Sequence, residues 1–204
     1  KPSTISVHLV AGKAYAEGLE RYRRELYFNN KDKNEALELA ILATIKAYGP
    51  FTANDWKKSW LSVCEAVVYY ADRYEKSAEN FWPFRLEGIP TVEISMAMPL
   101  DIVNPDTGEP IIYVGRADQI VTDNSSGLLY LEDDKTVSEL GQSFPRKHIN
   151  DGQFLGYTYM TRKEYDIDVR GVLIRAACFY ANRIDGDQVL HTYSDRQLSD
   201  WYNS

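Results

Sequence analysis

Cysteine is scarce in this sequence: Cys64 and Cys178 are the only two among 204 residues. Two thiols cannot build a disulfide framework, and they cannot supply the four thiolates of an iron–sulfur cluster. We therefore expect a protein without an iron–sulfur cofactor, working in a reducing, cytoplasmic compartment.

Long apolar segments are also missing. There is no run of about eighteen apolar residues, and the first residues lack the apolar region of a signal peptide. We expect a soluble protein with no membrane partner. Internal repeats, low-complexity tracts and linker-like segments are absent from the sequence, which favours a single domain over residues 1–204. The first residue is Lys1 instead of Met, which is compatible with a trimmed chain.

Positive charge is in deficit, with a net charge of −7 and a pI near 5.0. This balance argues against a protein held on nucleic acid by a globally basic surface. It remains compatible with an enzyme that grips DNA locally and uses acidic residues to hold a metal. Short basic clusters exist at residues 21–24, 57–58 and 146–148, although such clusters are more often solvated surfaces than binding sites.

Hydrophobic periodicity divides the chain into a helical part and an α/β part. Segments with helical spacing and capping signals are expected over 9–27, 34–48 (capped by Asn34), 53–80, 150–162 and a last helix capped by Ser194. Segments with strand patterns are expected over 91–100, 111–122, 128–134, 169–180 and 188–193. The order predicts an α/β domain with a mixed central sheet flanked by helices, mainly helical over 1–85 and with its core over 86–204.

The three consecutive strands allow their register to be calculated. If the second turn is centred between residues 125 and 126, Asp118 lies opposite Asp133 on the neighbouring strand. If the first turn is centred between residues 105 and 106, Glu93 lies opposite Asp118. Directly opposed side chains share a face of the sheet, about 5 Å apart at Cβ. A bulge would shift either register, so the Asp118–Asp133 pair is the firmer prediction.

The third strand ends in an unusual acidic cluster, Glu132-Asp133-Asp134 followed by Lys135. Residues two apart on a strand share a face, so Lys135 joins Asp133, whereas Glu132 and Asp134 point to the other face, solvated or paired. Two close carboxylates raise each other's pKa unless a cation neutralises them. Hard oxygen ligands suit Mg²⁺ or Mn²⁺, and a lysine beside them suits phosphodiester hydrolysis. The alternative is a surface hairpin whose charges are solvated.

These residues resemble a known family. Gly115-Arg-Ala-Asp118 on one strand and Asp133-Asp-Lys135-Thr on the next are similar to the core motif of the PD-(D/E)XK nuclease superfamily, which has a restriction-endonuclease-like core. Gln153-Phe-Leu-Gly-Tyr157 on the following helix is similar to the QxxxY motif of the RecB-like branch. The resemblance is strongest to phage-encoded RecB-type exonucleases and spans most of residues 8–180. DxK alone is a weak signal, but the ordered set is specific.

The resemblance implies roles for the acidic cluster. Asp118 and Asp133 would ligate Mg²⁺ or Mn²⁺, with the backbone carbonyl of Asp134 as a third ligand. Lys135 would be the catalytic lysine. Gln153 and Tyr157 would contact DNA or brace the site, although Tyr157 is equally compatible with ordinary helix packing.

Other residues are weaker candidates. Additional DNA-binding or site-bracing roles are expected for Arg116, Arg146, Lys147 and His148. Aromatic side chains that could stack on an unpaired base, or belong to the core, are Tyr15, Trp56 and Trp60.

The sequence departs from the family pattern on the first helix. RecB-like nucleases commonly carry GxxxHxxxE there, with the histidine as a metal ligand, whereas this chain has Gly12, Ala16 and Glu20 in that frame. Glu20 and Glu93 are then candidate further ligands, and His8 is a conceivable substitute for the missing histidine. Losing a nitrogen ligand favours an all-oxygen site and therefore Mg²⁺.

Together these features predict a metal-dependent DNA nuclease, an exonuclease of phage origin working in DNA recombination, repair or degradation in the host cytoplasm. Its partners would be DNA and either further copies of itself or a recombination protein. One alternative is a catalytically silent DNA-binding or assembly module of the same fold, supported by the missing histidine. Another is a Ca²⁺-binding or other hydrolytic carboxylate protein, which would need neither Lys135 nor Gln153.

Overall fold

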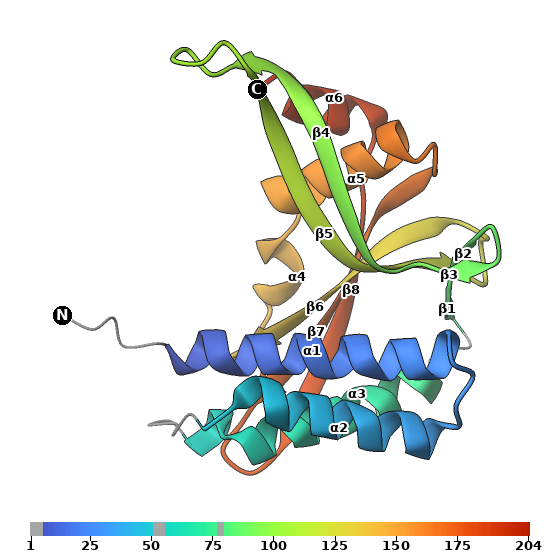
Figure 1. The fold of residues 1–204 in the computed structure, drawn as a ribbon, viewed down its shortest axis with the longest axis vertical. Helices are drawn as coiled ribbons and strands as arrows, with labels where there is room; N and C mark the ends of the chain where they lie inside the picture. Colours follow the sequence, from blue (N-terminus) through green and yellow to red (C-terminus); the bar gives the residue numbers. More distant parts are fainter. Residues whose placement is uncertain (1–5, 51–55, 77–79) are drawn as a thin grey trace.

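The protein folds as a mixed β-sheet between two groups of helices (Figure 1). The computed structural model describes residues 6–50, 56–76 and 80–204. Helices α1 and α3 cover one face of the sheet and α2 packs against both of them, while α5 lies across the other face. The α-helices span Val7–Tyr27 (α1), Lys33–Tyr48 (α2), Trp60–Lys76 (α3), Phe144–Lys147 (α4), Gly152–Glu164 (α5) and Asp195–Tyr202 (α6).

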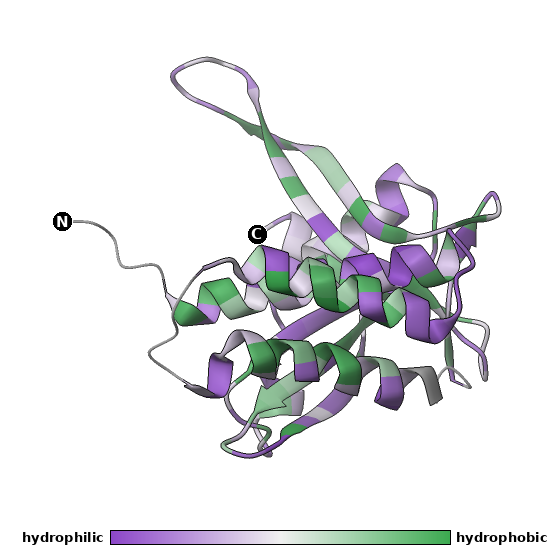
Figure 2. Cartoon of the chain, turned by 60° about the horizontal axis from the view of Figure 1, so that its bottom comes forward, coloured by the Kyte–Doolittle hydropathy of each residue, from purple (hydrophilic) through white to green (hydrophobic). Residues whose placement is uncertain are grey.

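Helices α1 and α2 begin where short polar side chains cap them. Ser6 accepts a hydrogen bond from His8 N–H at the start of α1, and Asp32 accepts from the N–H groups of Asn34 and Glu35 at the start of α2. The predicted cap Asn34 is therefore wrong, because Asp32 lies two residues earlier and Asn34 is already inside the helix. Figure 2 shows hydrophobic positions interleaved with hydrophilic ones along these helices, as expected for helices with one buried face.

The third predicted helix, over residues 53–80, is interrupted at Ser59. Its described part consists of a short 3₁₀ turn, Trp56–Lys58, and then α3. Ser59 separates the two, and its hydroxyl accepts a hydrogen bond from Ser62 N–H, which starts a new helix instead of continuing the turn. Residues 53–55 and 77–79 of the predicted helix lie outside the described residues.

Six strands form the main sheet, in the order β1-β5-β6-β7-β8 with β4 paired to β5. Pairing of β6 with β7 is parallel, and the other pairings are antiparallel, as the predicted mixed sheet requires. The strands span Phe81–Pro83 (β1), Val92–Val103 (β4), Pro110–Asp123 (β5), Leu129–Val137 (β6), Val169–Phe179 (β7) and Ile184–Thr192 (β8). A separate pair, Arg85–Leu86 (β2) and Ile89–Pro90 (β3), was not expected from the sequence, nor were β1 and α4.

The register calculated for β5 and β6 is confirmed. Gln119 pairs with Glu132 and Thr122 with Leu129, so paired residue numbers sum to 251 as predicted. The register near Glu93 also matches, since Ile94 pairs with Ala117. Paired residue numbers sum to 211 at Ile94 and Ala117, as predicted, but to 213 at Val103 and Pro110, next to the turn. An irregularity between Pro99 and Val103 produces this change in register, and the sequence alone did not indicate it.

The hairpin of β4 and β5 extends well beyond the rest of the sheet (Figure 1). Its base packs on α5, where Met96, Met98 and Ala117 join a core with Phe154 and Met160. Among the described residues, no helix has the length and apolar character needed to cross a membrane.

Candidate functional site

The candidate site lies where β5 and β6 separate. Their backbone ladder ends at Gln119 and Glu132, one step before Asp118 would face Asp133. Beyond that point the N–H of Asp134 donates a hydrogen bond of 2.7 Å to Oδ2 of Asp118. The aspartate side chain thus replaces the missing strand partner of this N–H group. The Asp118 carboxylate thus lies at the β6 segment that carries Asp133, near enough for the charge of Asp133 to act on it.

Asp133 and Lys135 share a face of β6, as predicted from their spacing. Nζ of Lys135 lies 2.8 Å from Oδ2 of Asp133, and the two side chains are 31% and 8% exposed. The ammonium also lies 5.3 Å from the ring centroid of Phe154 on α5, a cation–π contact. Lys135 is therefore held between an acid and an aromatic face, with part of its surface open to solvent.

The two acids are poorly stabilised as anions. Burial and the nearby charge of Asp133 together raise the pKa of Asp118 to about 7, although Arg23 and the N–H of Asp134 act in the opposite direction. Burial also raises the pKa of Asp133 to about 6, against the lowering effect of Lys135. One lysine faces two carboxylates, so this group carries one unbalanced negative charge when both are ionised.

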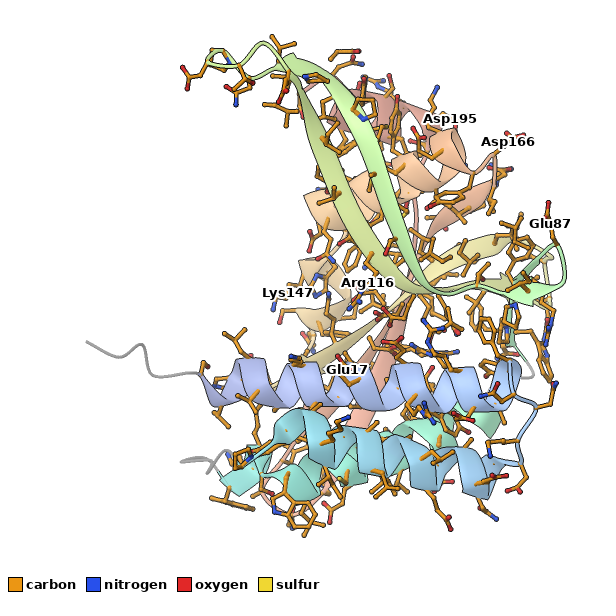
Figure 3. The ribbon with its side chains drawn as sticks, viewed as in Figure 1. Glu17, Glu87, Arg116, Lys147, Asp166 and Asp195 are labelled. Atoms are coloured by element: carbon orange, nitrogen blue, oxygen red, sulfur yellow. The ribbon has the colours of Figure 1, made fainter. Side chains whose placement is uncertain are left out.

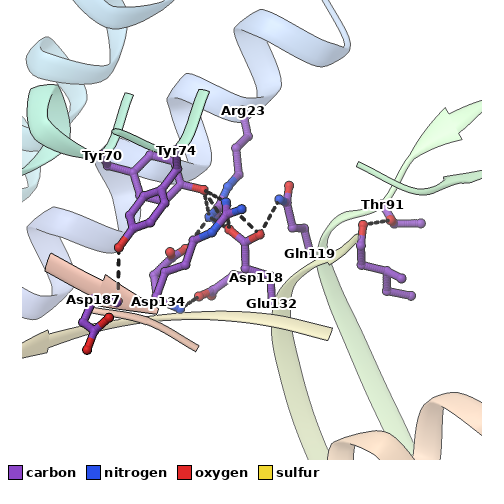
Figure 4. Close-up of polar contacts among 11 residues, drawn as sticks. Arg23, Tyr70, Tyr74, Thr91, Asp118, Gln119, Glu132, Asp134 and Asp187 are labelled. Carbon is purple, nitrogen blue, oxygen red and sulfur yellow. Dashed lines mark hydrogen bonds and ion pairs between the residues drawn. The ribbon is translucent and has the colours of Figure 1, made fainter. Parts of the chain in front are cut away.

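A buried ionic network occupies the opposite face of β6 (Figure 4). Arg23 on α1 donates from Nη2 to Glu132 Oε1 at 2.6 Å and to Tyr70 OH at 2.7 Å, and it also binds Asp134 Oδ2. Arg175 on β7 donates to the same Tyr70 hydroxyl and to Glu132 Oε1, both at 3.0 Å. The prediction that Glu132 and Asp134 point away from Asp133 is confirmed, and both are paired.

This second group is balanced in charge. Burial alone would raise the pKa of Glu132, but Arg175 and Arg23 lower it below its ordinary value. Burial raises the pKa of Asp134 to about 7 despite the opposing effect of Arg23. Two arginines thus face two carboxylates, which is the condition under which buried charges are tolerated.

Tyr157 packs against the strand that carries Asp118. A Cβ atom added at Gly115 would overlap the Tyr157 ring, so the absence of a side chain at Gly115 permits this close approach. The tyrosine also contributes to the electrostatic environment of Lys135. This placement suits the bracing role, with Gln153 one turn earlier on α5 and half-buried.

Glu93 occupies a strained position beside the site. It has a left-handed backbone conformation (φ 56°) inside β4, and its carboxylate, 6% exposed, lies 2.9 Å from Nε of Arg116. Burial raises the pKa of Glu93, Arg116 lowers it, and Glu20 raises it. Glu20 itself accepts a hydrogen bond of 2.7 Å from Arg24. Both predicted accessory acids therefore have arginine partners.

The part of α1 that corresponds to the GxxxHxxxE motif passes close to the end of β6. A Cβ atom built at Gly12 would lie 3.6 Å from Oγ1 of Thr136, the residue after Lys135. Ala16 lies one turn further along the same side of α1. His8, near the start of α1, donates its backbone N–H to the capping side chain of Ser6.

The predicted basic contacts differ in exposure. Arg116 on β5 is 60% exposed, and Arg146 and Lys147 on α4 are also exposed; Figure 3 labels Arg116 and Lys147. His148 is buried, with Nδ1 at 3.2 Å from Asp151 Oδ2 and its ring against Phe154. Its surroundings therefore fit bracing of α5 better than direct contact with DNA.

The aromatic candidates for base stacking also differ in solvent exposure. Tyr15 is 2% exposed and belongs to the core formed by α1, α2 and α3, where burial raises its pKa well above the ordinary value. It cannot stack on a ligand without unfolding that core. Trp56 and Trp60 are 61% and 49% exposed.

The donor set of the site fits a hard divalent cation. Asp118 and Asp133 offer carboxylate oxygens beside one unbalanced charge, and Mg²⁺ commonly takes one or two carboxylates plus waters. No group of three or more histidine, cysteine, aspartate or glutamate side chains arranged to hold a metal occurs in the part of the chain that the structure describes. A complete shell would thus need the Asp134 carbonyl, water or phosphate oxygens.

The sequence analysis did not identify the two arginines that bind Glu132 and Asp134 on the reverse face of β6. Arg23 lies within the buried side of an amphipathic helix, and Arg175 interrupts the apolar run of β7. Charged residues at core-facing positions are rarely buried without a partner, so these two could have been matched to the unexplained acids Glu132 and Asp134. Tyr70 and Gln119, which complete the network, carried no comparable signal.

Comparison with known proteins adds little. No family model and no curated protein matches this sequence. Among solved structures, one titled "Crystal structure of SSO0001" is similar over 100% of this chain and 75% of that chain, with 13% identity and a TM-score of 0.35. Likeness at this level supports no conclusion about the fold family or the activity of this chain.

Proposed function

We propose that this protein is a metal-dependent DNA nuclease with a PD-(D/E)XK core. The observation that carries the proposal is the convergence of Asp118, Asp133 and Lys135 at the fork between β5 and β6. Two partly buried carboxylates with a single lysine leave a negative charge that a divalent cation would neutralise. A structural salt bridge would not need the second acid.

The arrangement of elements supports the family assignment. An antiparallel sheet of β4, β5 and β6 is followed by α5 and a parallel strand, β7, and the motif residues lie at adjacent points of β5, β6 and α5. Tyr157 packs on Gly115, so two of the three sequence motifs touch each other. This order agrees with the family's core.

The chain's own residues have distinct parts in hydrolysis. Asp118, Asp133 and the Asp134 carbonyl would hold a divalent cation, which supplies an activated water and neutralises phosphate charge. Lys135, fixed between Asp133 and Phe154, presents an ammonium group to a phosphate oxygen as negative charge develops during bond breakage. Arg116 and Lys147 are exposed and positively charged, so they suit contacts with neighbouring phosphates.

A catalytically silent DNA-binding module is the second candidate. Ala16 in place of the family's histidine favours it, since one metal ligand is lost. Intact Asp118, Asp133 and Lys135 favour the enzyme, because a binding module gains nothing from two destabilised acids.

Incubation of linear and closed-circular DNA with Mg²⁺ tests the proposal. We expect loss of the linear form, inhibition by a chelator and loss of activity in Lys135→Ala. Lys46→Ala, which removes an exposed lysine from α2, is the matched control and should cleave like the wild type. DNA binding without cleavage, at any Mg²⁺ or Mn²⁺ concentration, would favour the silent module, and cleavage of the circle would indicate an endonuclease.

A further inference from the structure

We propose that Arg23 is a positioning residue that fixes the metal-binding segment of β6 from the reverse face of the sheet. This inference rests on the proposed function, because the segment it fixes carries the predicted cation ligands. Arg23 belongs to the N-terminal helical region. It lies 109 residues before Glu132 and 111 residues before Asp134 in the sequence. The catalytic strand would therefore depend on α1 for its geometry.

The contacts of Arg23 bracket Asp133. Its side chain is 1% exposed, and its Nη2 group binds Glu132 on one side and Asp134 on the other. Both acids point to the reverse face, so Asp133 between them must point to the front. Holding residues 132 and 134 thus fixes the direction in which Asp133 presents its carboxylate.

The segment needs such support because one of its edges is unpaired. Past Glu132, β6 has no ladder with β5, while β7 still pairs along the other edge through Val137. On the free edge, the N–H of Asp134 is satisfied by Asp118 instead of by a strand. The position of that N–H group therefore sets the position of the Asp118 carboxylate, and Arg23 holds the same residue through its side chain.

Arg175 provides a matched comparison within the same network. It is nearly as buried as Arg23, but its hydrogen bonds and ion pair go to Glu132 and Tyr70 instead of Asp134. Removing either arginine deletes one buried charge of the balanced group and should destabilise the fold to a similar degree. A specific effect on Asp134 should follow the loss of Arg23 alone.

A purely electrostatic role of Arg23 and a positioning role predict opposite effects of its removal on cation binding. If Arg23 acts only as a charge, Arg23→Met makes the site more negative and should tighten Mg²⁺ binding. If it positions the ligands, Arg23→Met should weaken Mg²⁺ binding by about tenfold or more, as expected for residues that orient metal ligands. Arg175→Met should then leave the dissociation constant within about twofold of the wild type.

Two measurements on the full chain test this inference: calorimetric titration with Mg²⁺, and amide hydrogen exchange of Asp134 in the metal-free protein. We expect Arg23→Met to speed exchange at Asp134 relative to core amides of β7, and Arg175→Met to leave that ratio unchanged. Equal ratios in the two variants, or tighter Mg²⁺ binding by Arg23→Met, would overturn it. A wild type that binds no divalent cation would instead refute the proposed function, whatever the exchange result.

Arg23→Lys serves if Arg23→Met does not fold. Lysine retains the charge and one donor nitrogen, so exchange at Asp134 should be slower than in Arg23→Met and faster than in the wild type. With Arg175→Lys as its control, faster exchange confined to Arg23→Lys supports the inference, and the same rate in both variants contradicts it.

Discussion

The backbone N–H of Asp134 and the carboxylate of Asp118 join β6 to β5 by a 2.7 Å hydrogen bond at the point where their ladder ends. This contact holds the Asp118 carboxylate at the β6 segment that carries Asp133, although Asp118 and Asp133 are not a backbone pair. It also means that the acids are held together by the fold before any cation binds. The consequences of that forced proximity can be measured.

Neutralising Asp118 should abolish metal binding without lowering the stability of the metal-free protein. In Asp118→Asn, the repulsion with Asp133 disappears, so the metal-free protein should melt at the wild-type temperature or slightly higher. Mg²⁺ should no longer raise the melting temperature, because a ligand stabilises a protein only as far as it binds the folded state. Thermal melting with and without Mg²⁺ checks both expectations, and a normal Mg²⁺-induced rise in the variant would remove Asp118 from the ligand set.

Lys135→Ala should have the converse effect. It deletes a cation that competes with the metal, so Mg²⁺ should still raise the melting temperature. DNA cleavage should fall by roughly 10²- to 10³-fold, the usual effect of removing a group that stabilises the transition state. A cleavage time course beside the melting curves is the measurement, and wild-type cleavage by this variant would make Lys135 a surface charge.

The metal-free protein should lose stability as pH rises from about 4 to about 7. Asp118 has a folded pKa of about 7 and Asp133 of about 6, both above the ordinary aspartate value, so the folded state keeps protons that the unfolded state releases in this window. For Asp118 alone the loss should be on the order of 4 kcal/mol, and it should level off above the folded pKa. Urea denaturation at several pH values should therefore give a flatter profile for Asp118→Asn; superimposable profiles would argue against the raised pKa.

Gly115→Ala should destabilise the protein by about 1–3 kcal/mol through overlap with the Tyr157 ring. Gly141→Ala is a suitable control, because nothing lies within 4 Å of the added Cβ at that position. Denaturant unfolding of both variants gives the difference. Equal stabilities would mean that Tyr157 moves freely and does not brace β5.

Ala16→His introduces the residue that RecB-like nucleases, which the sequence resembles, commonly carry on the first helix. Because Gly12, one turn earlier, faces Thr136 at the end of β6, the new imidazole should reach the site and tighten Mn²⁺ binding. Calorimetric titration with Mn²⁺ is the measurement. An unchanged affinity would place Ala16 away from the cation.

Local pattern was enough to predict much of the fold. The alternation along β4, β5 and β6 and the turn at residues 123–127 predicted the register of β5 with β6, and hence that Asp118, Asp133 and Lys135 would meet. The register prediction succeeded because strand pairing across a short turn depends on neighbouring residues alone. Errors occurred where a nearby side chain offered an alternative, as Asp32 did for the cap of α2 and Ser59 at the start of α3.

Tertiary structure decided what surrounds the acids. No periodicity places Arg23 beside Glu132 and Asp134, because the contact joins α1 to β6 across a sequence separation of more than a hundred residues. Strand alternation likewise does not indicate the left-handed conformation of Glu93 or the irregularity in the β4–β5 hairpin. The sequence by itself determined which side chains share a strand face, since that depends on the two-residue period of the backbone. Only the tertiary structure, which packs α1 onto the sheet and aligns β7 with β6, decided that Glu132 and Asp134 meet arginine side chains, while Asp133 meets Lys135.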